Sequence, residues 1–353
     1  MNRVIIVGGG LAGMVLAFRL HEEDIPFLLI DKPSLSSSSK VAAGLWNPLV
    51  FKRMSKSWMA EELVPELHRF FKTCERKTGV DFLCKRISIK PFTEDQEKTL
   101  WKNRVYQDLS TFAEAQDYKG IPQGYEACTF TNGYGKIFES GNVYINTFLE
   151  AGKAFFKDCL VEEDFDYAQL QIRERSVVYK NWETETLVFC EGHLVKHNPY
   201  FSWIPLKPAK GEILHITAPK LKIKKGVYNR DGFILDSEEG KFIVGSTYNW
   251  LELNDKASPA GLKELEKKLS RMISCDYTVI SHLAGVRPSS IDRRPIIGAH
   301  PKHKHLFVFN GLGAKGVMLA PYFAGKFVHF LKQKQDLPPE VDVARFYKLY
   351  AAH

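Results

Sequence analysis

A glycine-rich turn between two short apolar strands constrains the fold of this chain more than any other feature. Residues 4–7 read VIIV, the turn from Gly8 to Gly13 reads GGGLAG, a helical stretch follows, and a second apolar strand ends at Asp31. In such a unit Gly8 permits the tight turn, Gly10 lets the backbone approach a pyrophosphate, and Gly13 lets the helix pack closely on the strand. The N-terminus of the helix attracts phosphate, and Asp31 can accept hydrogen bonds from a ribose. The pattern predicts a Rossmann-type domain that binds NAD, NADP or FAD. In the alternative interpretation the glycines serve packing alone.

Composition excludes several other classes of protein. The 353 residues are enough for two domains, and the net charge of +8 is spread along the sequence, so we expect no nucleic-acid surface. The six cysteines occur singly, without metal-ligand spacing, which is typical of a reducing compartment and predicts no metal site. The first strand begins close to Met1, and no apolar run has the length of a membrane span. We therefore expect a cytoplasmic protein without a signal peptide.

Hydrophobic periodicity divides the chain into two kinds of region. Helical spacing predicts helices over 58–78, 142–156 and 258–273, and over a long stretch that ends at Lys334. Between Gly211 and Ser246, short apolar runs alternate with turns, as in an antiparallel sheet. We therefore predict that insertions between the strands of the nucleotide domain build a second, mainly antiparallel domain.

Three further segments point to a family. They are residues 41–48 (VAAGLWNP), 285–298 (GVRP followed by DRRPIIG) and 310–316 (NGLGAKG). Together with the glycine turn, they resemble the D-amino-acid oxidase-like family of FAD enzymes, which includes glycine and sarcosine oxidases. The resemblance spans nearly the whole chain and implies FAD as the cofactor. No cysteine or histidine stands where a covalent flavin bond could be placed, so we expect noncovalent binding.

This resemblance completes the predicted architecture. It implies an α/β fold in which a Rossmann-type FAD-binding domain, like that of glutathione reductase, carries a mainly antiparallel substrate domain. We assign residues 1–80, 140–200 and 280–353 to the FAD-binding domain. Residues 81–139 and 201–279 form the predicted substrate domain.

The resemblance also implies roles for individual side chains. Arg287 matches the arginine that holds the carboxylate of an amino-acid substrate, and its planar fork suits that task. A structural ion pair with Asp292 or a neighbouring carboxylate is the alternative. Tyr228 matches a tyrosine that hydrogen-bonds the carboxylate, although Gly232 replaces the second tyrosine of the family. Lys315 matches a lysine that stabilises the negative charge of reduced flavin together with a helix N-terminus, and an exposed loop lysine is its alternative.

We therefore predict two sets of site residues. The catalytic set is Arg287, Tyr228 and Lys315. Phe165 is expected to pack on adenine, and the serine-rich loop 34–39 is expected to approach the pyrophosphate. Residues 245–250 are expected either to line the substrate pocket or to belong to the core. The cofactor-binding set comprises Gly8, Gly10, Leu11, Ala12, Gly13, Asp31, Lys32, Ser39, Lys40, Ala43, Gly44, Leu45, Phe165, Gly313, Ala314, Lys315, Gly316, Val317 and Met318.

The implied reaction is oxidation of the C–N bond of a small amino acid or secondary amine. Hydride passes to flavin N5, the imine is hydrolysed in water, and the electrons go to oxygen or another acceptor. One alternative function is that of an oxidase with the same fold that acts on a carboxymethylamine of modified tRNA uridine. Residues 205–211 suit this tRNA-modifying branch as well as the amino-acid branch of the family. The methyltransferase half of the tRNA-modifying enzyme is lacking in this chain. The other rivals are an NAD-dependent dehydrogenase and a relative that binds the nucleotide without turning over an amine.

Overall fold

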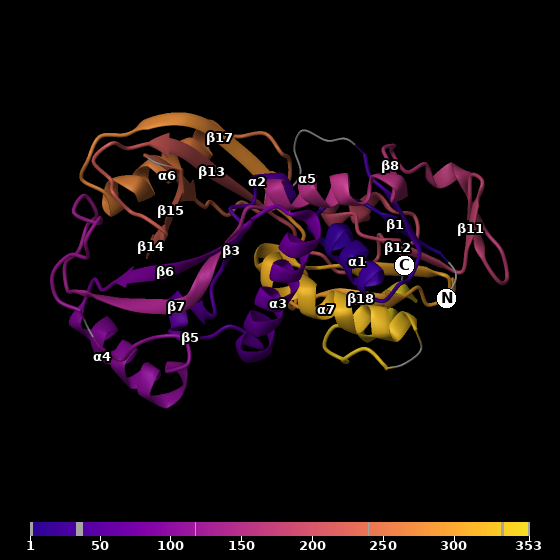
Figure 1. Ribbon diagram of the computed structural model, residues 1–353, viewed down its shortest axis with the longest axis horizontal. Coiled ribbons are helices and arrows are strands. Elements are labelled where there is room, and N and C mark those ends of the chain that lie inside the picture. Colours follow the sequence, from indigo (N-terminus) through magenta and orange to yellow (C-terminus); the bar gives the residue numbers. More distant parts are fainter. Residues whose placement is uncertain (1–2, 33–37, 117, 239, 333–334, 352–353) are drawn as a thin grey trace.

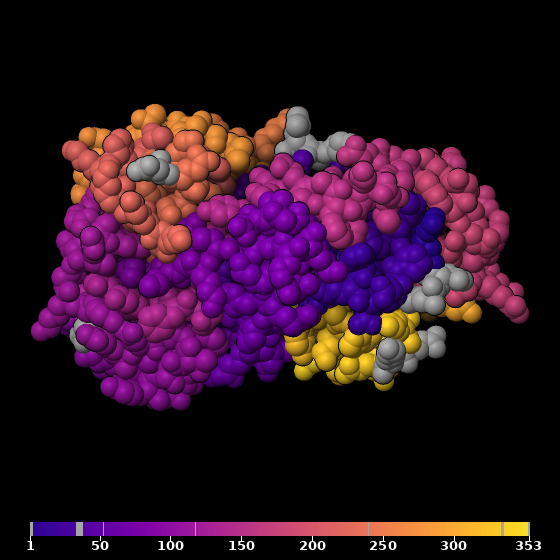
Figure 2. Space-filling view, in the orientation of Figure 1, coloured from indigo at the N-terminus to yellow at the C-terminus, as the bar shows by residue number. Residues whose placement is uncertain are grey.

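The computed structural model describes residues 3–32, 38–116, 118–238, 240–332 and 335–351. The molecule is elongated, with one large sheet towards each end of its long axis (Figure 1). Both chain termini lie beside the same sheet, the one that contains the first strand (Figure 1). In the space-filling view the residues around 100 and those around 270 together form the opposite end of the molecule (Figure 2).

The sheet near the termini has six strands and is mostly parallel. In spatial order these are β18 (Ile296–Ala299), β19 (Leu306–Asn310), β12 (Thr186–Phe189), β1 (Val4–Val7), β2 (Phe27–Ile30) and β8 (Leu160–Val161). Only the pair β18–β19 is antiparallel. Every side chain of β1 and β2 is buried, which explains their uninterrupted apolar sequences. The predicted Rossmann-type unit is confirmed.

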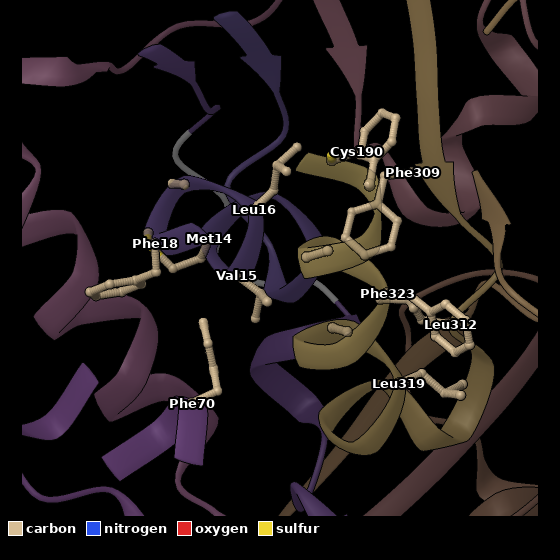
Figure 3. Close-up of a cluster of buried hydrophobic side chains, with 14 of the residues drawn as sticks. Met14, Val15, Leu16, Phe18, Phe70, Cys190, Phe309, Leu312, Leu319 and Phe323 are labelled. Carbon is tan, nitrogen blue, oxygen red and sulfur yellow. The ribbon is translucent and has the colours of Figure 1, made fainter. Parts of the chain in front are cut away.

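Helices cover this sheet and are held by a shared apolar core. Helix α1 (Leu11–Glu22) packs against α7 (Gly316–Leu331) and α5 (Ile145–Phe155), and α3 (Ala60–Thr78) packs on α7. Figure 3 shows Met14, Val15 and Phe18 of α1 within this cluster, with Phe323 on α7. Helix α3 ends at Gly79, which adopts φ +72°, the left-handed conformation that stops many helices.

The second sheet has eight strands and is antiparallel except at one pair. In spatial order these are β17 (Thr278–Arg287), β13 (Ala209–Thr217), β16 (Lys241–Gly245), β15 (Gly232–Glu238), β14 (Gly226–Arg230), β6 (Leu83–Pro91), β7 (Tyr134–Val143) and β3 (Leu45–Trp46). The parallel pair is β14–β6. Helix α6 (Pro259–Met272) packs on β13 and β16, and the Ser258 hydroxyl accepts from Gly261 N at its start. The mainly antiparallel second unit is thus confirmed.

The remaining elements are short. They are α2 (Ser38–Val41), β4 (Leu49–Val50), β5 (Ser55–Lys56), α4 (Asp95–Arg104), a π-helical turn (Val105–Leu109), β9 (Leu170–Ile172), β10 (Val177–Tyr179), β11 (Trp182–Thr184), α8 (Tyr347–Tyr350) and 3-10 turns at 51–53, 157–159, 167–169, 192–197, 313–315 and 343–346. No helix in the described ranges is long and apolar enough to cross a membrane.

Some predicted boundaries differ from the structure. The helix expected from Asn142 begins at Ile145, because residues up to Val143 pair with β6 as part of β7. The last long helix ends at Leu331, and residues 333–334 lie outside the described ranges, as do Ser34–Ser37 of the expected pyrophosphate loop. The predicted domain boundary at residue 280 falls inside β17. Pairing between distant strands decided the first of these boundaries, and no local signal could have shown it.

Candidate functional site

A cavity of about 1070 Å³ is lined by residues from both large sheets. Its wall includes the ends of β1, β2 and β12 on the nucleotide side, and parts of β13, β15 and β17 on the other side. Parallel α/β sheets typically bind nucleotides at the carboxyl ends of their strands, and this cavity has that position.

The glycine turn forms the nucleotide end of the cavity. Gly8 adopts φ +102°, and a Cβ there would lie 2.6 Å from the carbonyl oxygen of Cys190, so only glycine fits. Gly10 precedes α1 without a side-chain cap, which leaves N–H groups of the first turn available to a phosphate. Ser39 Oγ accepts a hydrogen bond from Leu11 N at 3.1 Å. The cavity is lined by Gly8, Gly10, Leu11, Ala12, Asp31, Lys32 and Ser39 of the predicted cofactor-binding set.

Asp31 is held in place from two directions. Its Oδ1 accepts from Gly9 N at 2.7 Å, and its Oδ2 lies 2.5 Å from Nζ of Lys153 on α5. The sequence analysis missed Lys153, which stands 122 positions from Asp31 and carries no local signal. The carboxylate therefore has a fixed orientation at the position where a ribose is expected.

An aromatic wall lies beyond Asp31. Phe165 lines the cavity and stacks on Tyr179, with ring centroids 4.2 Å apart. Glu191 also lines it, accepting hydrogen bonds from the Tyr167 hydroxyl and from Asn198 Nδ2, and burial raises the pKa of Glu191. The sequence analysis did not single out Glu191. Phe165 is thus placed where it could pack on an adenine ring.

Two glycine-containing segments line the middle of the cavity. Ala43, Gly44 and Leu45 belong to the first, and Gly313, Ala314, Gly316 and Val317 to the second, at the start of α7. A Cβ on Gly44, which has φ +66°, would lie 1.9 Å from Val143 O. Backbone N–H groups, glycine clearance and the fixed carboxylate together fit an adenine dinucleotide that carries a flat ring.

Besides Lys315, which is described below, three predicted cofactor residues do not line this cavity. Gly13 lies beneath it, where a Cβ would meet Gly8 O at 1.9 Å, so its contribution is the close packing of α1 on β1. Met318 is buried in the core between α1 and α7. Lys40 lines a separate, smaller cavity instead. Direct contact of these three residues with a cofactor is not supported.

Arg287 lies at the C-terminal end of β17 and lines the cavity. Its Nη1 donates to Thr247 O at 3.2 Å, its Nη2 donates to Ser246 Oγ at 2.9 Å, and the guanidinium lies 4.2 Å from the centre of the Tyr248 ring. Burial lowers the pKa of Arg287, since the surroundings disfavour the charged form. Neutral groups therefore fix the guanidinium without neutralising it.

The structural alternative for Arg287 is wrong. Asp292 pairs with Arg345 at 3.0 Å, and no ion pair to Arg287 occurs within the described ranges. Gly211 on β13 supplies the room that the guanidinium needs, because a Cβ there would lie 2.0 Å from Nη2. A half-buried arginine in a cavity wall without a carboxylate partner is suited to bind an anionic ligand.

Tyr228 is not in the site, which corrects the prediction. Its side chain is fully buried, packs near Tyr125 and Phe130, and donates its hydroxyl to Thr129 O. Tyr228 pairs directly with Ile234 across β14 and β15, so both share the face of the sheet that carries the core. The next pair places Phe233 on the opposite face, and Phe233 lines the cavity.

Lys315 also differs from its prediction. Its Nζ donates to Ser57 Oγ at 2.6 Å, and its side chain does not line the cavity although both of its chain neighbours do. Burial lowers the pKa of Lys315 to about 8, with a further contribution from the charges of Arg294 and Arg293. The lysine is not the exposed residue of the alternative, and the expected contact of its ammonium with a flavin is not supported.

A family model described as FAD dependent oxidoreductase matches residues 3–329. The chain belongs to the family of FAD-dependent oxidoreductases. FAD is therefore its cofactor, the fingerprint residues fit it, and the NAD interpretation is wrong.

Curated relatives and solved structures resemble the chain over most of its length. An uncharacterized oxidoreductase of Bacillus subtilis is 23% identical, covering 96% of this chain and 98% of its own. Glycine oxidase of Pseudomonas putida is 22% identical, covering 91% and 92%. The bifunctional tRNA 5-methylaminomethyl-2-thiouridine biosynthesis protein of Marinobacter nauticus is 21% identical over 91% of this chain, which spans 54% of that protein. The fold matches the crystal structure of glycine oxidase from Bacillus cereus with a TM-score of 0.76, 20% identity and coverage of 95% and 96%.

Proposed function

We propose that this oxidoreductase oxidises the C–N bond of an amine that carries a carboxylate, either a small amino acid or a secondary amine. The observation behind this proposal is Arg287, a half-buried cation in the cavity wall whose hydrogen-bond partners are neutral. A substrate carboxylate would supply the missing counter-charge. The similarity to a glycine oxidase agrees with this substrate class.

Each group in the substrate end of the cavity has a physical role in the proposal. Bound FAD would supply the acceptor for a hydride from the carbon next to the amine. Arg287 binds the carboxylate through its two forked N–H groups, and Ser246 with Thr247 O keeps that fork oriented. Phe233 and Ile213 supply apolar wall that excludes water around the reacting carbon. Holding the substrate in one orientation lowers the entropic part of the barrier. The imine product is then hydrolysed in water, and the electrons pass to oxygen or another acceptor.

A second candidate is oxidation of a carboxymethylamine on tRNA uridine. The relative from Marinobacter nauticus aligns with 91% of this chain, and the same arginine would bind the glycine-like carboxylate. The two candidates differ in the size of the substrate, so supplying modified tRNA and free amino acids in parallel separates them.

The test is anaerobic bleaching of the bound flavin by D-amino acids, glycine, sarcosine and proline, with the wild type and Arg287→Ala. Because hydrogen bonds to charged groups contribute about 1.5–3 kcal/mol each, losing two should reduce the second-order rate of bleaching by about 100-fold or more while the yellow colour remains. Arg173→Ala is the matched control, since Arg173 is exposed and pairs only at the surface with Glu183. Unchanged bleaching by Arg287→Ala would overturn the assignment.

A further inference from the structure

The segment between β16 and α6 presents an apolar surface to solvent beside the cavity. Tyr248, Trp250 and Leu251 are 49%, 55% and 93% exposed. Tyr248 itself lines the cavity, and so does Leu253 on the far side of the exposed tip. Three large apolar side chains in four residues, next to a binding cavity, form a contiguous patch of the kind that marks a binding surface. We call Tyr248, Trp250 and Leu251 the aromatic shelf.

Hydrogen bonds hold the shelf in one conformation. Asn249 Oδ1 accepts from the N–H groups of Leu251 and Glu252, at 2.8 and 3.2 Å, which closes the turn at the tip. The backbone of Asn249 exchanges two hydrogen bonds with Lys210 on β13. The apolar groups are therefore displayed on a tethered turn.

A buried lysine reinforces this tether. The Lys210 side chain is 1% exposed, and its Nζ donates to Asn254 Oδ1 at 3.0 Å and lies 3.5 Å from carboxylate oxygens of Glu212 and Glu252. Glu212 in turn accepts from the Ser258 hydroxyl at the start of α6. Burying a charged group costs free energy of folding. The buried Lys210 ammonium, which holds the turn of the aromatic shelf, therefore indicates that the position of this turn is important for function.

The shelf is continuous with the carboxylate site. The Arg287 guanidinium lies 4.2 Å from the centre of the Tyr248 ring, and the Tyr248 and Trp250 rings stack with centroids 6.1 Å apart. A ligand whose carboxylate binds Arg287 therefore has an aromatic surface within reach at the mouth of the cavity. Flat aromatic groups gain the most from such a surface.

We propose that the preferred substrate is an amino acid with a large aromatic substituent, whose carboxylate-bearing part enters the cavity while its ring packs on Tyr248 and Trp250. This inference rests on the proposed function, because it keeps the substrate carboxylate at Arg287, and it extends the substrate from a small amino acid to one that carries a ring. Trp250 becomes a residue that determines specificity, and Lys210 a positioning residue that acts through the turn. Glycine and sarcosine, which lack a ring, would use only the inner part of the site.

The first measurement is binding without turnover. Calorimetry on the FAD-loaded protein compares phenylacetate with acetate, for the wild type and Trp250→Ala. The wild type should bind phenylacetate at least about tenfold more tightly, the gain expected of an aromatic contact, and Trp250→Ala should lose most of that preference. Tyr106→Ala is the control, because Tyr106 is an 80% exposed aromatic residue on the π-helical turn outside the cavity wall, and it should keep the preference.

The second measurement is flavin reduction by matched amines. The ratio of kcat/KM for N-benzylglycine over sarcosine, and for phenylalanine over alanine, should fall about tenfold in Trp250→Ala, with the change mainly in KM. Equal binding of phenylacetate and acetate, or equal ratios in wild type and Trp250→Ala, would overturn the inference. A phenylacetate preference without reduction by any amine would instead contradict the proposed function and leave the shelf as a binding surface.

Discussion

The two ends of the cavity are formed by different kinds of groups. At the nucleotide end, backbone groups and glycines from one continuous stretch, residues 8–13, do most of the shaping. At the substrate end, side chains from separate strands converge, with Arg287 from β17, Phe233 from β15 and Tyr248 from the segment after β16. The nucleotide end therefore has almost no space for an added atom. The shape of the substrate end depends instead on which side chain each strand directs into the cavity.

The largest effect should come from adding a single methyl group at the nucleotide end. Gly13→Ala places a Cβ 1.9 Å from Gly8 O, so α1 must move away from β1. Overpacking of this kind costs about 1–3 kcal/mol, and the displaced glycine turn should no longer hold FAD. The flavin content of the purified protein and its denaturation midpoint measure both effects. Gly325→Ala is the control, because its Cβ would meet only the Arg19 side chain, with Nε at 3.7 Å and Cζ at 3.9 Å, and it should purify yellow.

At the substrate end, replacing the Arg287 guanidinium by an ammonium of the same charge should have the next largest effect. Arg287→Lys keeps a cation but loses the planar fork and its bonds to Ser246 and Thr247 O. We expect kcat/KM for a carboxylate substrate to fall about tenfold, since one charged hydrogen bond contributes about 1.5–3 kcal/mol, with normal flavin content. Steady-state kinetics and the flavin spectrum are the measurements. Wild-type kinetics in this variant would mean that no forked contact is made.

The corrected position of Tyr228 gives a smaller prediction. Tyr228→Phe removes the hydrogen bond to Thr129 O in the core and nothing from the cavity. Unfolding in urea should show a loss of about 0.5–1.5 kcal/mol, while the rate of flavin reduction stays at the wild-type level. A strong loss of substrate affinity without a loss of stability would return Tyr228 to the substrate site and contradict the structure.

Lys315 gives the smallest effect, a dependence of stability on pH. The folded chain releases the Lys315 proton near pH 8, whereas the unfolded chain keeps it up to the ordinary lysine pKa near 10.4. The unfolded state therefore binds more protons between these values, so the Lys315 contribution to the free energy of unfolding increases as the pH rises from 8 towards 10. Urea titrations at several pH values should show the wild type gaining stability relative to Lys315→Met in this window. The exposed Lys267→Met should show no such trend, and a flat difference for Lys315→Met would contradict burial of the charge.

The same contrast explains what the sequence could predict. The turn with Asp31, and the helices that end at Gly79 or begin after Ser258, depend on neighbours in the chain and were predicted correctly. Arg287 was singled out through a motif and lies in the cavity wall, whereas the contact of each individual residue with FAD stays a prediction.

The errors share one physical cause. Tyr228 was assigned to the right strand, but its face depends on pairing with β15, which sequence resemblance does not specify. Lys315 was assigned to the right turn, but its ammonium contacts Ser57, 258 positions earlier. Long-range partners of this kind, such as Lys153 beside Asp31, leave no periodic or local trace in the sequence.

The order of strands in the first sheet has a consequence for how this protein folds during synthesis. β1 lies between β2 and β12, and β12 pairs in turn with β19, so strands from positions 4–7, 186–189 and 306–310 must meet. On the ribosome a strand can pair only after its partner strand has been synthesised, and strands that are distant in the sequence pair slowly. A nascent chain carries the complete glycine fingerprint, residues 8–13, long before β19 and the start of α7, residues 306–316, have been made. We expect chains that stop before β19 to be colourless, and FAD to bind only after β19 and the start of α7 have left the ribosome.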